Sequence, residues 1–544
     1  MGHGGGSTLG VAAAMRPVVN AGPSPSPLDP SGFPGFCYFL GHPAEEQRST
    51  LGADPANAKR ISQALFSLLP HSVPAENPGI PSGYTYLLQF VAHDLVESTV
   101  PFWVAAGSGI PSRNMRQTGL LLDTLYGGGP VSCPMAFEPA GDLVESRTRL
   151  RLGRVDKPEK LNQPSGVCPF RDLPRLRMRT ASPADNFDNA SQLFAADNRN
   201  DSGVILAQIT VLFSILHNAI ADRIGARMPQ ARIAHASVAM LKMYHAIIRE
   251  DLSRRLLHAE VFKILKVRKA RDENWLWEGG GIPLELSHGA LRAGHAMVRP
   301  NYDFNGKNSF PIGKVVNGPR VQDGVRDPLP SEWIVAWSRF FELSGTPNLS
   351  LKLAIRQQMS LDIDGVLPSA PGDEAIGISV RDWMSAAAAR MWRLDALIGG
   401  VSQHYPQMKF LGAAEIRTWL QELIGGGSGM SAARTIVRDN IDTLAKDLPL
   451  PLYILLEAQR DATIDGKHLG PLGSIILGEV LFRLLTEAEA QVAPLVPGAR
   501  LALGEDDWSQ IEKVSDMSAL VRLAQDWGGL ADCRDMPFIA SPTS

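Results

Sequence analysis

Apolar residues with helical spacing dominate the chain beyond its first 35 residues. The clearest segment spans residues 204–228, and its apolar stripe consists of Ile205, Ile209, Leu212, Leu216 and Ile220. Residues 231–257, 381–401 and 469–492 are patterned in the same way. Alternating runs are few, and a short one such as residues 84–90 is equally compatible with a helix. The pattern predicts a mainly α protein with little or no sheet.

The connections between these segments are long. Residues 127–187 and 300–330 are rich in Pro and Gly, and loops of this length usually carry function or wrap the surface of a compact protein. Residues 1–35 are rich in Gly, Ser, Pro and Ala, and cannot bury enough apolar area to offset the entropy cost of ordering them. We therefore expect a flexible arm over residues 1–35 and one large helical domain over residues 36–544.

Composition narrows the choice of partners and location. Lys and Arg number 53 against 56 Asp and Glu, a formal net charge of −3 that argues against a nucleic-acid partner. The 4 cysteines are widely spaced, so neither a zinc site nor a disulfide framework is indicated. The first residues do not resemble a secretory signal, and no run of about 18 apolar residues indicates a membrane span. We expect a cytoplasmic protein, with non-classical export left open.

The first candidate for chemistry is the segment QFVAHDLVES, residues 89–98. Gln89 and His93 lie one helical turn apart in a largely apolar stretch, and Asp94 follows His93 directly. Three interpretations of His93 are open: a core histidine satisfied by its neighbours, a metal ligand, or an acid–base group above a cofactor.

Two further segments carry charged groups in unusual places. Arg199 stands in FAADNRNDSG just before the long apolar helix, where the positive end of the helix dipole does not favour a guanidinium. A surface arginine is the alternative interpretation. His295 lies in LRAGHAMVRPNYDFN, with Arg292 and Arg299 at positions i−3 and i+4. This pattern fits an axial ligand to a metal whose organic ring bears carboxylates, and it fits a solvent-facing histidine equally well.

Together these segments resemble the animal-type haem peroxidases, the superfamily of myeloperoxidase, lactoperoxidase and the cyclooxygenases, and most closely its bacterial branch. The resemblance runs from about residue 80 to about residue 485. The matching segments are, in family order, Q-x-x-x-H-D at Gln89–Asp94, a Leu-Asp…Tyr-Gly turn at 120–130, D-x-R at Asp197–Arg199, F-x-x-x-H-N at Phe213–Asn218, R-x-G-H at Arg292–His295 and a C-terminal segment at 448–481. The resemblance implies a large helical haem peroxidase fold with long irregular loops.

The resemblance also implies roles on the side of the haem where peroxide reacts, the distal side. His93 would take a proton from the inner oxygen of hydrogen peroxide and return it to the outer oxygen. Arg199 would stabilise negative charge on the leaving oxygen, an effect worth roughly 2.7–4 kcal/mol per donor in other enzymes. Gln89 would orient water, peroxide or a halide.

On the opposite, proximal side, His295 would bind the haem iron, with its other ring nitrogen held by a hydrogen bond. The family uses an Asn on a later helix for that bond, and the nearest match in this chain is Asp382. A carboxylate there would give the imidazole more imidazolate character. Arg292 would pair with a haem propionate, because its planar guanidinium suits carboxylates.

The sequence differs from the family at positions that determine how the haem is attached and which reaction is catalysed. Members that attach haem by ester bonds use a carboxylate just before the distal histidine and another three residues after the arginine, where this chain has Ala92 and Ser202. The resemblance therefore implies non-covalent haem b. Cyclooxygenases and related fatty-acid dioxygenases carry a radical-forming tyrosine at the position of Arg292, so their radical chemistry is disfavoured.

Calcium binding is left open by the same resemblance. Asp94 matches the metal-binding Asp of the family, but Gln117 and Leu121 stand where a hydroxyl and an Asp are expected. Calcium takes six to eight oxygen ligands, of which Asp123 and backbone carbonyls would supply only part. The alternative is that Asp94 bonds only to nearby backbone.

Under this resemblance the substrates are hydrogen peroxide and a small organic donor or halide. One alternative is a haem-binding protein of the same fold with lost activity, or a specialised oxidase of secondary metabolism. Another is a metal-dependent His-Asp phosphohydrolase, which would use His93, Asp94 and further ligands such as His71. His217 is expected to be a satisfied core histidine and His245 a solvated one.

Overall fold

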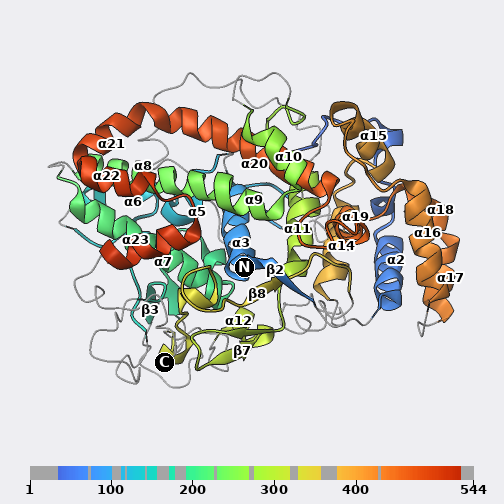
Figure 1. The fold of residues 1–544 in the computed structure, drawn as a ribbon, viewed down its shortest axis with the longest axis horizontal. Coiled ribbons are helices and arrows are strands. Elements are labelled where there is room, and N and C mark those ends of the chain that lie inside the picture. The colour runs from blue at the N-terminus through green and yellow to red at the C-terminus, as the bar shows by residue number, and fades with distance from the viewer. Residues whose placement is uncertain are drawn as a thin grey trace.

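Helix α7 (Val204–Arg223) is buried along almost its whole length in the computed structural model (Figure 1). Its neighbours include α3 (Gly83–Leu95), α8 (Pro229–Ile247) and α23 (Met517–Trp527). By length and composition alone α7 could cross a membrane, but its apolar window is entirely buried inside the fold. The all-round apolar surface of α7 is therefore that of a core helix.

Two further long helical runs pack around this core. Helix α8 continues through a π-helical turn, η7 (Ile248–Leu252), into α9 (Ser253–Leu256), so the pattern at residues 231–257 correctly predicted a helix. Helix α20 (Pro471–Val492) matches the prediction at 469–492. Its Gly478 permits close packing, since a Cβ there would lie 2.4 Å from Leu265 Cδ1 on α10 (Ala259–Lys266).

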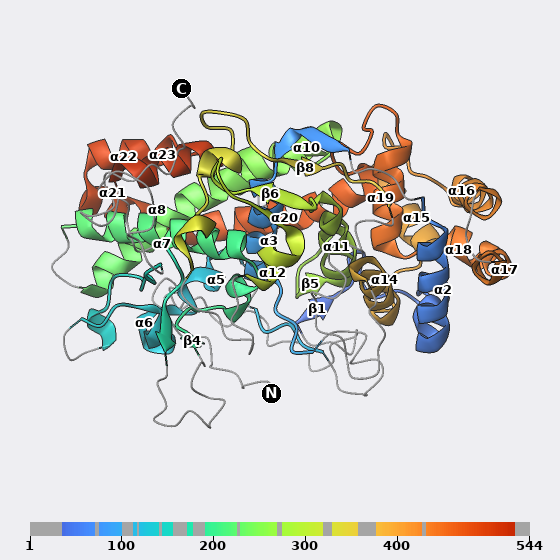
Figure 2. The same ribbon diagram turned by 90° about the horizontal axis from the view of Figure 1, so that it is seen from below.

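Smaller helices cover the two ends of the molecule, as both views show (Figures 1 and 2). At one end lie α21 (Val496–Leu503), α22 (Glu505–Glu512) and α23. At the other lie α2 (Pro55–Leu68), α16 (Ala413–Gly425), α17 (Ser431–Asp439) and α18 (Ile441–Lys446). Helix α19 (Leu450–Arg460) lies between this second group and the core.

The segment that carries His295 is helical but changes type along its length. A π-helical turn, η8 (Leu286–Ala290), leads into α11 (Leu291–Ala293) and then into a 3-10 turn, η9 (Gly294–Met297). Such changes of helix type are frequent at functional sites, because they redirect side chains that a regular helix would place elsewhere.

The prediction of one helix over residues 381–401 is wrong, because the chain forms two helices there, α14 (Ile378–Ala388) and α15 (Leu394–His404). The break lies at Arg390, whose φ is 44°. Beyond it the Trp392 amide donates to Glu285 Oε1 at 3.1 Å. A tertiary hydrogen bond thus replaces a helical one, which sequence periodicity cannot register.

Strands are short and pair only in twos within the described residues. The pairs are β1 (Phe36–Cys37) with β5 (Ile282–Pro283) in parallel, and, antiparallel, β2 (Glu76–Pro81) with β8 (Leu349–Leu351), β3 (Arg175–Arg177) with β4 (Ser191–Leu193), and β6 (Asn301–Asp303) with β7 (Ser309–Pro311). The prediction of a mainly α fold with little sheet is therefore confirmed.

The structure describes residues 35–70, 75–100, 112–116, 119–140, 144–155, 171–177, 191–225, 229–268, 275–318, 329–356, 377–426 and 431–527. The arm predicted at residues 1–35 lies outside these ranges except for Gly35. Buried apolar side chains form one cluster that reaches from Phe36 to Trp527. The extent of the domain, residues 36–544, stays a prediction.

Candidate functional site

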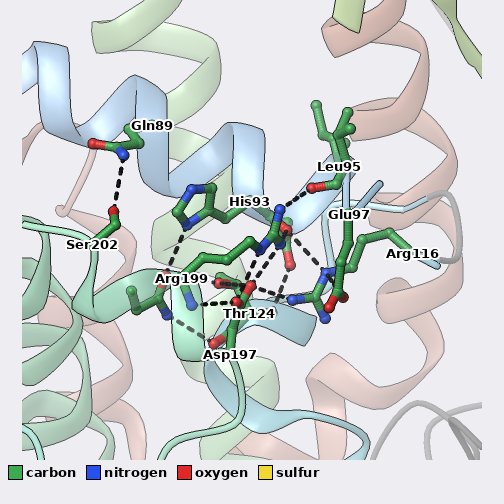
Figure 3. Close-up of polar contacts among 12 residues, drawn as sticks. Gln89, His93, Leu95, Glu97, Arg116, Thr124, Asp197, Arg199 and Ser202 are labelled. Atoms are coloured by element: carbon green, nitrogen blue, oxygen red, sulfur yellow. Dashed lines mark hydrogen bonds and ion pairs between the residues drawn. The ribbon is translucent and has the colours of Figure 1, made fainter. Parts of the chain in front are cut away.

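Gln89 and His93 lie on one face of α3, and both point toward the loop that precedes α7 (Figure 3). Gln89 Nε2 donates to Ser202 Oγ at 3.3 Å. His93 Nδ1 lies 3.1 Å from Asn200 Oδ1. The helical spacing therefore brings the two predicted side chains together, and both are half-buried.

Asn200 fixes which nitrogen of His93 carries the proton. Asn200 Nδ2 donates to the carbonyl of Thr124 at 3.0 Å, and a carbonyl can only accept, so the amide orientation is determined. Asn200 Oδ1 must then accept from Nδ1–H of His93. The lone pair of the neutral imidazole is therefore on Nε2, the nitrogen that has no hydrogen-bond partner among the described residues.

The surroundings of His93 favour its neutral form. Burial, followed by the positive charge of Arg199, lowers the pKa of His93 to about 4. The adjacent Asp197 is buried, yet the guanidiniums of Arg199 and Arg116 hold its pKa at about 2. At neutral pH the site thus combines a neutral imidazole with an ionised carboxylate that is already paired.

Arg199 lies at the carboxyl end of α3, although in sequence it precedes α7. Its Nη2 donates to the carbonyl of His93 at 2.8 Å, and its Nη1 donates to the carbonyl of Val96. Its Nε and Nη2 also bond to Asp197. The negative end of the α3 dipole favours a cation here, which explains an arginine that looked misplaced in the sequence.

These contacts use four of the five N–H groups of Arg199 and leave one hydrogen on Nη1. The side chain is 31% exposed and remains within the same cluster as His93. Its predicted role in stabilising a leaving oxygen stays a prediction, and the geometry adds a second role as a clamp on α3.

The second group of predicted side chains, His295, Arg292 and Asp382, is compact. Nδ1 of His295 lies 2.6 Å from Asp382 Oδ2, and Arg292 Nη1 lies 3.2 Å from Asp382 Oδ1. Asp382 is almost completely buried on α14, whereas the side chain of His295 is 32% exposed. The predicted Asp382–His295 hydrogen bond is present, while Arg292 has a protein carboxylate as a partner.

The segments that carry the two predicted clusters contact each other. A Cβ placed on Gly294 would lie 3.1 Å from Leu88 Cδ2. Gly294 directly precedes His295, and Leu88 directly precedes Gln89. The segments that carry the two histidines therefore meet at this contact.

The described residues do not fit a calcium site around Asp94. Its carboxylate accepts from the amides of Leu122 at 3.0 Å and Thr124 at 3.1 Å, and from Tyr244 Oη at 3.2 Å. Burial and the charge of Asp123 raise the pKa of Asp94 to about 7. No group of three or more His, Cys, Asp or Glu suited to a metal occurs in the described chain.

Position 117, part of the expected calcium loop, lies outside the described residues, as does His71, the ligand suggested for a phosphohydrolase. The alternative interpretation of Asp94, bonding to nearby backbone, is what the hydrogen bonds show.

The structure also describes His217, which was predicted to be a core histidine, and His245, which was predicted to be solvated. His217 is a satisfied core histidine, as predicted, with Nδ1 3.0 Å from Tyr126 Oη and Nε2 3.0 Å from the carbonyl of Thr148. The prediction for His245 is wrong, because this residue is buried and its Nε2 lies 2.6 Å from the carbonyl of Leu120.

Comparison with known proteins adds structural likeness alone. No family model and no curated protein matches the sequence. Peroxidase A from Dictyostelium discoideum superposes with a TM-score of 0.52 at 13% identity, over 92% of this chain and 94% of that one. A fatty acid alpha-dioxygenase from Arabidopsis thaliana gives 0.50 at 11% identity, over 89% and 78%. One from Oryza sativa with palmitic acid gives 0.50 at 10%, over 88% and 80%.

The chain has the fold of the animal haem peroxidases. Identities this low leave the activity to be argued from the site. Haem binding is a property of that superfamily, and the residues here fit the group. The imidazole of His295 has Nδ1 engaged by a carboxylate, which leaves Nε2 as the nitrogen that could bind a metal, and Arg292 offers further donors for a propionate.

Sequence reasoning missed Asn200 and Arg116 as members of the site. The sequence drew attention only to the neighbouring Arg199, whereas the side chain of Asn200 bonds to His93. Arg116 directly precedes Gln117 of the expected calcium loop, and its Nε donates to the carbonyl of His93 at 3.0 Å. Only the position of Asn200, next to Arg199, could have suggested its role.

Proposed function

We propose that the protein is a haem peroxidase that reduces hydrogen peroxide and oxidises small organic donors or halides. The observation that carries this proposal is the fixed tautomer of His93, which presents an unprotonated Nε2 beside Arg199 and Gln89. The fold of the animal haem peroxidases supports it. So does a second imidazole, His295, on an adjoining segment.

Bound haem b would supply an iron that accepts peroxide and exchanges electrons with it. Nε2 of His93 would take the proton from the inner oxygen of peroxide and donate it to the outer oxygen, which then leaves as water. Because Nδ1 keeps its own proton in the bond to Asn200, the same nitrogen that takes the proton also returns it. Two one-electron donors and two further protons complete the reduction of peroxide to two water molecules.

Arg199 and Gln89 would assist this transfer without exchanging protons. The remaining Nη1 hydrogen of Arg199 would stabilise the negative charge that develops on the leaving oxygen. Gln89, held by Ser202, would orient peroxide, water or a halide one helical turn from His93.

On the proximal side, Nε2 of His295 would hold the iron. Asp382 accepts from Nδ1 and would increase the electron density of the ring, which strengthens it as a ligand. Arg292 shares Asp382 and would moderate this effect, while its other N–H groups pair with a haem propionate.

Non-covalent attachment of the haem is part of the proposal. Ala92 has no carboxylate, and the hydroxyl of Ser202 accepts a hydrogen bond from Gln89. Neither residue can form the carboxylate ester that other members use.

A fatty-acid dioxygenase is the second candidate, because two structures with a TM-score of 0.50 are fatty acid alpha-dioxygenases. Arg292 disfavours it, since the resemblance places a radical-forming tyrosine there in that class.

Both activities can be tested with one preparation. Purified protein loaded with haem should oxidise a dye donor only when peroxide is present. Consumption of oxygen with palmitate, without peroxide, would favour the dioxygenase instead. A normal haem absorption band with neither reaction would favour a binding protein that has lost activity.

A further inference from the structure

Arg116 is a buried cation beside the distal histidine. Its side chain is only 7% exposed. Its Nε donates to the carbonyl of His93 at 3.0 Å and lies 3.3 Å from Glu97 Oε2, and its Nη2 pairs with Asp197 (Figure 3). The guanidinium therefore ties the end of α3 to the loop before α7.

Carboxylates surround this guanidinium. Although burial opposes the charged form, Asp197, Glu97, Asp94 and Asp123 keep the pKa of Arg116 above its usual range. Asp94, Asp123 and Asp197 are themselves buried. A buried carboxylate that stays ionised, as Asp197 does, is stabilised by a compensating positive charge, which a bound metal ion or a basic side chain can supply.

We propose that Arg116, together with Arg199, supplies the positive charge of this site and that Arg116 is a positioning residue for His93, so that the protein needs no calcium here. The oxygens of Asp94 already accept from two backbone amides and one hydroxyl. A guanidinium supplies the positive charge from within the chain and bonds in fixed directions, which a spherical ion does not.

A short series of contacts connects Arg116 to the imidazole. Asp197 Oδ2, which pairs with Arg116, lies 3.2 Å from Thr124 Oγ1. The same hydroxyl lies 3.2 Å from Asn200 Oδ1, the atom that accepts from His93 Nδ1. Loss of Arg116 would therefore leave the carbonyl of His93 and the carboxylate of Asp197 with Arg199 as their remaining guanidinium, and would loosen the contacts that hold Asn200 against the imidazole.

The influence on His93 rests on the proposed function, because only there does the imidazole act on a substrate. The requirement for a cation beside the buried carboxylates does not rest on the proposed function. The tests below need neither haem nor peroxide, so their failure is distinguishable from failure of the peroxidase proposal.

The first experiment measures thermal unfolding of the full-length protein with EGTA and with added calcium chloride. The wild type is expected to unfold at the same temperature in both. Arg116→Ala should lower the midpoint by about 5 °C or more, because Arg199 would then be the remaining guanidinium paired with the buried Asp197. Arg113→Ala, which removes an exposed arginine of the same segment, is the matched control and should leave the midpoint unchanged.

The second experiment records ¹⁵N spectra of histidine-labelled protein, with His93→Gln used to assign the signal. The wild type should show His93 protonated on Nδ1 alone. Arg116→Ala should give a mixture of tautomers, and Arg116→Lys, which keeps the charge, should restore part of the Nδ1–H form. A residue that only stabilised the fold would leave this signal unchanged.

A midpoint that falls with EGTA or rises with calcium would overturn the proposal, since a metal ion would then be the cation. Equal midpoints for Arg116→Ala and Arg113→Ala would also overturn it. If Arg116→Ala does not fold, the wild-type measurements and the Arg116→Lys spectrum still decide whether the proposal holds.

Discussion

The two histidines of the candidate site differ in the group that holds Nδ1. For His93 this group is the neutral amide of Asn200 at 3.1 Å, whereas for His295 it is the carboxylate of Asp382 at 2.6 Å. An amide leaves an imidazole neutral and able to take up and return a proton. A carboxylate makes the ring richer in electrons and a stronger metal ligand.

The charged groups around the two histidines differ in the same sense as the groups that hold Nδ1. Arg199 and Arg116 both donate to the carbonyl of His93, and positive charge near the ring disfavours its protonated form. On the side of His295, by contrast, Arg292 bonds to Asp382, the carboxylate that also bonds to His295. Histidine is thus suited to two different tasks by its neighbours, and under the proposed function these are the tasks of a base and of a metal ligand.

Removing the ligand should have the largest effect. His295→Ala is expected to weaken haem retention more than about 100-fold, because loss of even a residue that only hydrogen-bonds to a metal ligand costs about 10–100-fold. Haem content per protein, measured by absorption, tests this, with the exposed His404→Ala as control. Full haem occupancy in His295→Ala would remove His295 as the axial ligand.

Removing the base should spare haem binding and slow catalysis. His93→Ala is expected to keep its haem and to react with peroxide about 10²–10⁴-fold more slowly, the range of positioned acid–base groups. Stopped-flow absorption after addition of peroxide measures the rate. An unchanged rate would show that His93 does not move the proton.

Changing the proximal partner is a milder test of the comparison. Asp382→Asn keeps a hydrogen-bond acceptor but loses the negative charge, so the ferric–ferrous reduction potential should rise. Asp382→Ala should in addition weaken haem binding about 10–100-fold. A potential that does not move in Asp382→Asn would contradict an electronic role for the carboxylate.

Changing the distal partner should shift a pH profile. Because the pKa of His93 is lowered to about 4, the rate with peroxide should be constant from neutrality to about one pH unit above that value and should fall to half near it, where half of the rings are protonated. Asn200→Asp places a carboxylate beside the ring, which favours the protonated form, so the fall should begin at a higher pH. Rates at matched haem content over a pH series measure this, and identical profiles would contradict it.

Much of the fold was predictable because it depends on local periodicity. The apolar pattern at 204–228 and 469–492 predicted α7 and α20, since a long helix buried on most sides needs apolar residues throughout. The break at Arg390 was not predictable, because Trp392 bonds to a residue more than one hundred positions earlier.

The site was predictable only where one residue type does one recognisable task. The spacing of Gln89 and His93 indicated a shared helical face, and Asp382 was found by position relative to the family. Asn200 and Arg116 were missed, because their roles come from contacts between loops distant in sequence. His245 was misjudged for the same reason, since its partner is the carbonyl of Leu120.

The most direct test of the central claim is a crystal structure of the protein with haem bound. We expect the iron to be coordinated by Nε2 of His295, with Nε2 of His93 facing the opposite side of the same porphyrin. Haem iron coordinated by another residue, or a bound porphyrin that does not lie between His93 and His295, would contradict the account.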